Sequence, residues 1–121
     1  MEKKKDLKDR TKNFALRIIR MYSSLPKSPA AEVMGTQVLR SGTSVGANYQ
    51  EASQGRSKAE FVAKMGDCLK EIEETTYWLE LLIDGTILPE NKLAGLLQES
   101  KELKAIFLAI IKSTKSNSKK K

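Results

Sequence analysis

The chain has 121 residues, of which 40% are hydrophobic and 31% are charged, and its formal net charge at pH 7 is +7. This length fits one domain with a single core, and the positive charge makes an anionic partner a natural expectation. One cysteine excludes an intramolecular disulfide, and the absence of histidine removes the commonest general base and the commonest zinc ligand.

A first helix is predicted over residues 6–24. Residues 1–12, MEKKKDLKDRTK, are rich in charged side chains and lack the apolar core of a signal peptide. Leu7, Thr11 and Phe14 begin a row of residues at steps of three and four, which is typical of one helix face. Pro26 ends this helix, because the residue before a proline avoids helical torsions.

A second helix is predicted over residues 29–54, with Ser28 as its N-cap and a proline at its first position. It is poor in large apolar side chains. Gly42 and Gly46 lie four residues apart, and their natural use is a close contact with a neighbouring helix. Gly55 is expected to stop the helix.

A third helix is predicted over residues 58–84, where Ser57 and Glu60 fit a capping box. A fourth is predicted over residues 89–113, with a proline at its start. The longest apolar run, residues 105–111, is too short to span a membrane.

The short connections predict an all-α fold, an antiparallel up-down-up-down four-helix bundle, in a single domain over residues 1–114. Residues 115–121 contain no apolar side chain and are expected to form a disordered basic tail. The low apolar share suggests that some of the core is completed by self-association.

The basic ends of the chain are the best candidate for a nucleic-acid surface, because phosphate binding requires only clustered cations. An equally open interpretation is a solvated face with a solubilising tail. The candidate residues are Lys3, Lys4, Lys5, Lys8, Arg10, Lys12, Arg17, Arg20, Lys119, Lys120 and Lys121.

A polar stripe runs along the second helix at steps of four, four and three. It consists of Arg40, Ser44, Asn48 and Glu51. It is interpreted as a ligand site, a network across a subunit boundary, a solvated stripe or a hydrogen-bond network within the chain. A buried amide must be fully paired, so Asn48 is a candidate for fixing register.

Glu71, Glu74 and Thr75 lie near one another on the third helix. Paired carboxylates can carry out acid–base chemistry or hold a metal. Because carboxylate sites in bundles usually add a histidine, we expect no metal site here, and instead a salt bridge to Arg40 or Arg56.

Cys68 sits within a helical apolar pattern and is expected to be a small core residue rather than a nucleophile. Tyr77, Trp78 and Leu81 widen the apolar surface near the end of the third helix. They are interpreted as packing residues or as anchors of an interface.

Two motifs carry a resemblance to a known family. LRSGTSVGANYQEASQGRSKAEF at residues 39–61, followed by CLKEIEETTYWLELL at residues 68–82, resembles the four-helix-bundle family called 23S rRNA-intervening sequence proteins. The resemblance covers residues 8–113. The family's characteristic positions correspond to Arg40, Ser44, Asn48, Glu51, Phe61, Glu71, Glu74, Thr75 and Trp78.

The resemblance implies an antiparallel four-helix bundle that assembles as a ring-like homopentamer, and it implies no enzymatic activity. Some members are encoded within insertions in ribosomal-RNA genes. A structurally similar relative assists a retroelement reverse transcriptase and binds nucleic acid through a basic surface.

The leading hypothesis is therefore a cytoplasmic, non-enzymatic oligomer without a cofactor, which binds RNA or other nucleic acid through phosphate contacts. The rival is a protein-interaction scaffold that docks a partner through the apolar and acidic third helix.

Overall fold

The computed structural model describes residues 2–119, with side chains for residues 6–117, and within that range the chain is all-α. The elements are α1 (Glu2–Ser23), α2 (Pro29–Ser53), α3 (Lys58–Asp84) and α4 (Glu90–Lys119). Met1, Lys120 and Lys121 lie outside the described residues, so the predictions made for the last two lysines are not tested.

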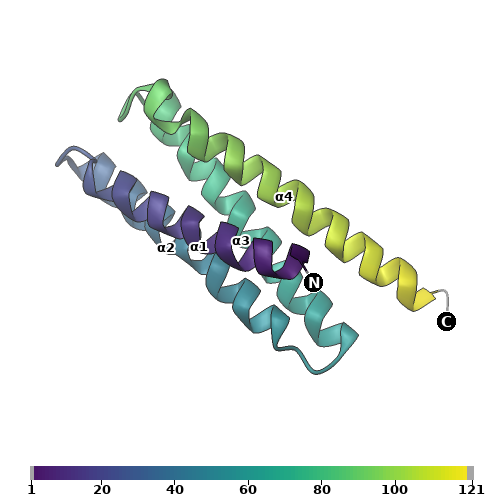
Figure 1. The fold of residues 1–121 in the computed structure, drawn as a ribbon. Helices are drawn as coiled ribbons and strands as arrows, with labels where there is room; N and C mark the ends of the chain where they lie inside the picture. Colours follow the sequence, from purple (N-terminus) through teal and green to yellow (C-terminus); the bar gives the residue numbers. More distant parts are fainter. Residues whose placement is uncertain (1, 120–121) are drawn as a thin grey trace.

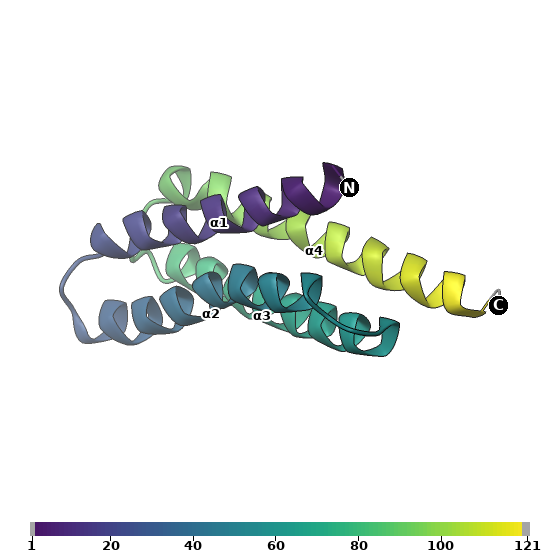
Figure 2. The same ribbon diagram turned by 60° about the horizontal axis from the view of Figure 1, so that its bottom comes forward.

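Each helix returns alongside the one before it (Figure 1). α2 packs against both α1 and α3, and α3 packs against α4, whereas α1 and α4 touch only sparsely. Figure 2 shows that α4 reaches well beyond the first turn of α1. Of the four pairs of helices in contact, α1 and α4 therefore pack together least extensively.

The caps of the two middle helices explain why the sequence predicted their bounds to within one residue. The Ser28 hydroxyl accepts a hydrogen bond from the Ala31 amide at 3.2 Å, and the Ser57 hydroxyl accepts one from the Glu60 amide at 3.1 Å. The Glu60 carboxylate, however, accepts from the amide of Arg56 at 2.9 Å, one residue before the position expected for a capping box.

The outer ends of α1 and α4 were predicted too short. α1 begins at Glu2 rather than near residue 6, because Glu and Lys are strong helix formers and an acid is favoured in the first turn. α4 continues to Lys119, so residues 115–119, expected to be disordered, extend the helix. No glycine or proline interrupts this stretch, and lysines are favoured near a helix C-terminus.

All four helices contribute to one hydrophobic core. Its largest fully buried members include Phe14 and Ile18 from α1, Leu79 from α3 and Phe107 from α4. The prediction that Cys68 is a small core residue is confirmed, because it is fully buried in this cluster.

Two pairs of hydroxyls cross the core and join α3 to both of its neighbours. Thr75 Oγ1 lies 2.9 Å from Ser41 Oγ on α2, and Thr76 Oγ1 lies 2.9 Å from Ser100 Oγ on α4. Thr75, Ser41 and Ser100 are completely buried. Because a buried hydroxyl is costly without a partner, these pairs favour one sliding register of α3 against α2 and α4.

The small residues of α2 allow the close approach of α1 that the glycine spacing predicted. A Cβ added at Gly42 would lie 2.9 Å from Ile18 Cγ1, and one added at Gly46 would lie 3.3 Å from Thr11 Oγ1. Ile18 is fully buried, so its side chain has little room to move away.

We therefore expect Gly42→Ala and Ile18→Ala to be coupled. Ile18→Ala alone should cost about 2–5 kcal/mol of unfolding free energy through the cavity it leaves. Gly42→Ala alone should lower the free energy of unfolding by about 1–3 kcal/mol through overpacking. The better helix propensity of alanine should offset part of this loss. In the double variant the added methyl occupies the vacated space, so the loss should fall short of the sum by about 1 kcal/mol or more.

Urea unfolding at a fixed protein concentration measures all three variants. Gly66→Ala is the matched control, because a Cβ at Gly66 meets nothing within 4 Å. It should stabilise α3 by about 0.5–1 kcal/mol. Strictly additive losses at Gly42 and Ile18 would contradict the close contact.

Candidate functional site

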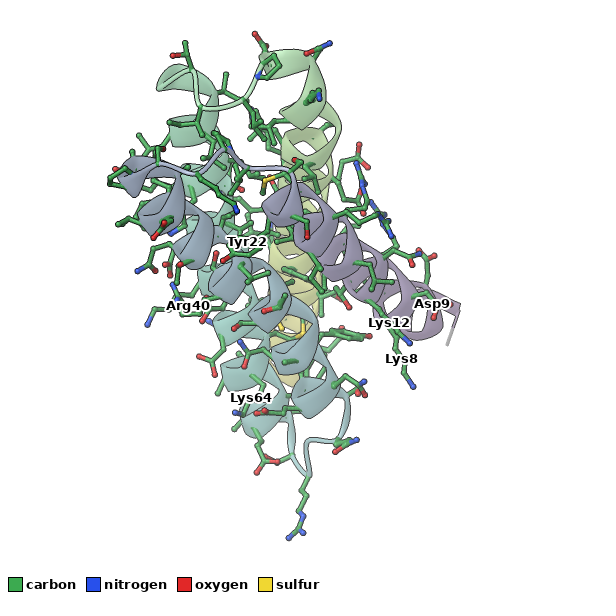
Figure 3. All side chains as sticks on the ribbon, turned by 90° about the vertical axis from the view of Figure 1, so that its left-hand side faces the viewer. Lys8, Asp9, Lys12, Tyr22, Arg40 and Lys64 are labelled. Carbon is green, nitrogen blue, oxygen red and sulfur yellow. The ribbon has the colours of Figure 1, made fainter. Side chains whose placement is uncertain are left out.

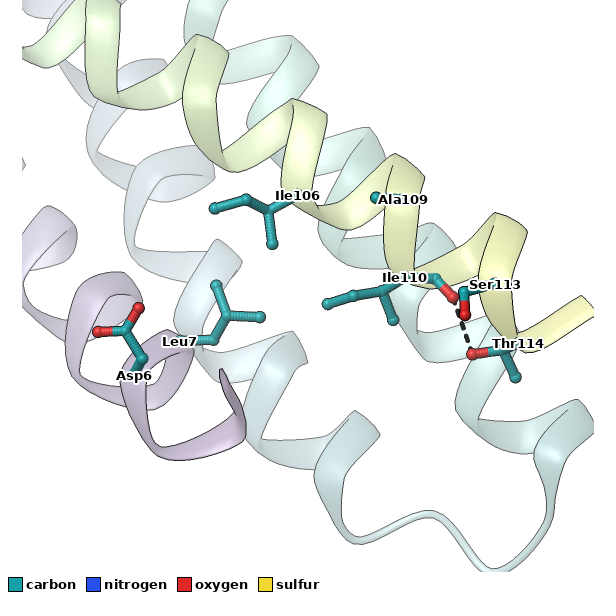
Figure 4. Close-up of a pocket in the computed structure, with 7 residues that line it drawn as sticks. All are labelled: Asp6, Leu7, Ile106, Ala109, Ile110, Ser113 and Thr114. Carbon is teal, nitrogen blue, oxygen red and sulfur yellow. Dashed lines mark hydrogen bonds between the residues drawn. The ribbon is translucent and has the colours of Figure 1, made fainter. Parts of the chain in front are cut away.

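α1 begins and α4 ends in the same half of the molecule, and the last turns of α4 project beyond the start of α1 (Figures 1 and 2). Between the start of α1 and the second half of α4 is a groove of about 470 Å³, drawn in Figure 4. It is lined by Asp6, Leu7, Ile106, Ala109, Ile110, Ser113 and Thr114. The Thr114 hydroxyl donates to the Ile110 carbonyl oxygen at 2.8 Å, so its hydrogen-bonding capacity is used within α4. The remaining lining of the groove is largely apolar.

The excess positive charge is concentrated at the two ends of the chain. Residues 1–5 and 119–121 contain six of the 22 basic residues and one of the 15 acidic residues, so they carry five of the seven net positive charges. The remainder of the chain is close to neutral. Residues 3–5 belong to the first turns of α1, and Lys119 is the last residue of α4.

Arg10 was predicted to contact phosphates, but the structure engages it with two carboxylates of α4. Its Nη2 atom lies 2.6 Å from Glu99 Oε1 and 3.2 Å from Glu102 Oε1, and its Nε atom lies 3.1 Å from Glu99 Oε2. The hydrogen bond to Glu99 is the main cause that raises the pKa of Arg10. Because these carboxylates offset its charge, we expect Arg10 to contribute little to phosphate binding.

Lys8 and Lys12 line a groove of about 340 Å³ between α1 and α2, next to Asp9. Figure 3 shows these three side chains together on the first part of α1. Asp9 offsets part of their charge. Arg17 and Arg20 lie further along α1, where they face Lys92 at the start of α4 across another pocket. Lys92 carries no local sequence signal that links it to α1, because it is distant from α1 along the chain.

The polar stripe of α2 is partly an ion-pair network within the chain. Arg40 Nη1 lies 3.4 Å from Glu71 Oε1, and Arg40 Nη2 contacts Glu74 Oε2. The expected salt bridge from Arg40 is therefore confirmed. Trp78 Nε1 donates to the same Glu74 oxygen at 3.0 Å, and Gln37 Oε1 accepts from Arg40 at 3.3 Å.

The other predicted members of the stripe do not join this cluster. The Ser44 hydroxyl donates to the Arg40 carbonyl oxygen at 2.7 Å within its own helix, and Glu51 pairs with Lys64 at 2.6 Å. Asn48 is half-buried between them, and Arg56 lies exposed in the connection to α3. Thr75 belongs to the buried hydroxyl pair with Ser41.

An aromatic patch lies on the outer surface of α3. Tyr77 is 54% exposed, and its ring meets that of Trp78 edge to face at a centroid distance of 5.2 Å. Leu81 is partly buried one turn further along. Beside Tyr77 a shallow pocket of about 430 Å³ brings Glu73 and Glu80 close to Lys101 and Lys104.

The thiol of Cys68 is expected to be a poor nucleophile in the folded protein, because burial raises its pKa to about 12. At pH 8 the thiolate, which is the nucleophile, should be about a thousandfold scarcer than for a free cysteine. We expect disulfide-exchange labelling of the folded protein to be slower by a similar factor than labelling in urea. Prompt labelling of the folded protein at pH 8 would contradict this burial.

Two further properties bear on function. Among the described residues, no group of three or more Cys, Asp or Glu side chains is placed to hold a metal ion. None of the helices in the described part of the chain is long and apolar enough to cross a membrane.

Comparison with known proteins gives a family match and a similar solved structure. Residues 3–109 match the family described as 23S rRNA-intervening sequence protein. The fold is similar to the crystal structure of a protein with unknown function from the S23 ribosomal protein family of Bacteroides thetaiotaomicron, with a TM-score of 0.85 and 41% sequence identity. That similarity covers 91% of this chain and 98% of the other. No curated protein matches the chain.

Proposed function

Because this chain belongs to the 23S rRNA-intervening sequence protein family, we propose that it is a non-enzymatic, oligomeric helical bundle that binds RNA or other nucleic acid through phosphate contacts. The proposed architecture is an antiparallel up-down-up-down bundle that assembles as a homopentamer. The observation that carries the binding proposal is the segregation of charge along the chain, with five of the seven net positive charges in residues 1–5 and 119–121.

This segregation favours a polyanion over a small ligand. Clustered lysines release counterions when they neutralise phosphates, and this contribution needs no base contacts and no shaped pocket. Several copies of the same basic end in one oligomer would also bind a single strand multivalently. Lys3, Lys4, Lys5 and the lysines of residues 119–121 are the principal contacts in this proposal.

An exposed apolar row on α1 supports self-association. Leu16 is 40% exposed and Ile19 is 43% exposed, and Tyr22 continues the row at the next three-residue step. Leu16 and Ile19 point away from Phe14 and Ile18, which are buried in the core, whereas the ring of Tyr22 is turned toward Gly35 of α2. A row of large apolar residues on one helix face is better stabilised against a second copy than in water.

The aromatic patch of α3 supports a second candidate function, a scaffold that docks a partner protein. Tyr77 and Trp78 are residues of the type that anchor interfaces, and Tyr77 is more than half exposed. In this alternative the basic ends serve only to keep the oligomer soluble.

The first experiment is fluorescence anisotropy with RNA and DNA across a salt series, with the protein mass determined by light scattering in the same buffers. We expect an oligomer whose binding constant falls steeply and linearly with salt on logarithmic axes, with little sequence preference. An oligomer that binds neither polymer at low salt would contradict the nucleic-acid proposal and favour the scaffold.

A further inference from the structure

A cationic pocket lies between the second half of α1 and the first turns of α4. Its volume is about 450 Å³. Arg17, Arg20 and Lys92 contribute three positive charges to its lining, and Ser24 and Asn91 contribute polar side chains. No Asp or Glu belongs to the lining.

These three cations line one pocket and, in the described part of the chain, have no carboxylate partner, a state they share with several other described lysines and arginines. Arg10, Arg40, Lys64 and Lys104 each form an ion pair. Within the described side chains, by contrast, no carboxylate lies within ion-pair distance of Arg17, Arg20 or Lys92. Three like charges gathered without a counter-charge repel one another, so this arrangement is stabilised when an anion occupies the pocket.

The guanidinium of Arg17 lies next to Gly95 of α4. A Cβ added at Gly95 would lie 3.0 Å from Arg17 Nη2, so the absence of a side chain on α4 provides the space for the guanidinium. Arg17 is half-buried there, which limits its freedom. Beneath the cations, Met21, Leu88 and Leu96 are buried and form an apolar floor.

We propose that this pocket binds a phosphate monoester, and specifically the terminal phosphate of an RNA or DNA strand. A monoester carries a charge of about −1.5 to −2 near neutral pH, whereas an internal phosphodiester carries only one negative charge. Three cations around one concave site match the greater charge. Arginine also offers paired N–H donors that suit phosphate oxygens.

The identity of the strand rests on the proposed nucleic-acid function, but the phosphate chemistry does not. The first test therefore uses no nucleic acid. Methyl phosphate and dimethyl phosphate are titrated separately into the ¹⁵N-labelled protein, and the amide signals of Lys92 and Gly95 are followed by NMR. We expect saturable shifts with the monoester, at least about tenfold weaker binding of the diester, and loss of the shifts in Arg17→Gln/Lys92→Gln.

The matched control is Lys58→Gln/Lys70→Gln, which removes the same charge from exposed positions of α3. This control should bind methyl phosphate as the unmodified protein does. Equal shifts with both esters, shifts that never saturate, or binding that survives in Arg17→Gln/Lys92→Gln would overturn the pocket assignment, whatever happens with nucleic acid.

The second test compares one RNA sequence with a 5′-phosphate, a 3′-phosphate or hydroxyls at both ends. One phosphorylated end should bind about tenfold more tightly than the hydroxyl form, and Arg17→Gln/Lys92→Gln should abolish that preference. Equal binding of all three RNAs would overturn the strand-end assignment while leaving the nucleic-acid function intact. Binding of methyl phosphate with no binding of any RNA would show that the pocket serves a small phosphate monoester and that the nucleic-acid function is wrong.

Discussion

Replacing the six terminal lysines, Lys3–Lys5 and Lys119–Lys121, by glutamine is expected to weaken RNA binding at least about a hundredfold near 0.1 M salt. The segments concerned hold most of the net charge, whereas the rest of the chain is nearly neutral. If each lysine meets one phosphate of a single strand, the logarithmic salt slope should also become shallower by about 4. Fluorescence anisotropy over a salt series measures both effects.

The control for this experiment is Arg10→Gln. Arg10 is engaged by Glu99 and Glu102, so its loss should change RNA affinity less than about twofold, and its ion pairs should contribute at most about 1 kcal/mol to stability. An unchanged affinity after all six lysines are replaced would refute the role of the chain ends. A large loss with Arg10→Gln would place the binding surface on the α1–α4 side.

If the chain assembles as proposed, the double substitution Leu16→Glu/Ile19→Glu is expected to convert the oligomer into a folded monomer of 13.5 kDa. Both side chains are more than a third exposed in the single chain, so the fold should tolerate the change. In an interface, each unpaired glutamate would lose hydration at a cost of several kcal/mol. Light scattering measures the mass, and circular dichroism checks that the helices remain.

A matched control places the same two charges on other helices. Tyr77 is 54% exposed on α3 and Leu108 is 46% exposed on α4, so Tyr77→Glu/Leu108→Glu adds two glutamates at comparably exposed sites. This control should keep the oligomer. If it dissociates the oligomer and Leu16→Glu/Ile19→Glu does not, the contact between copies involves α3 or α4 rather than the outer face of α1.

The sequence predicted the middle of the fold well because the signals there are local. Ser28 and Ser57 cap helices through atoms only three residues away, and a proline such as Pro29 is readily accommodated in a helix only in its first turn. The outer ends were harder to predict. Lysine-rich stretches are equally compatible with a solvated helix and with no helix, because no apolar face marks their periodicity.

The candidate sites were predicted less well than the fold. Arg40 could be assigned to Glu71 and Glu74 because α2 and α3 are consecutive helices with complementary stripes. The partners of Arg10 and the meeting of Arg17 with Lys92 depend on how α1 approaches α4. Residues about 75–90 positions apart meet there, and one sequence contains no local signal for such a contact.

The sparse contact between α1 and α4 implies a hierarchy of local stability within the bundle. α2, α3 and α4 are linked in series by extensive packing and by the two buried hydroxyl pairs, whereas α1 is secured mainly through α2. In an isolated chain, α1 is therefore the unit that opens at the lowest free energy, and its amides exchange with solvent before those of α3. The element that bears the exposed apolar row would then gain the most protection from assembly.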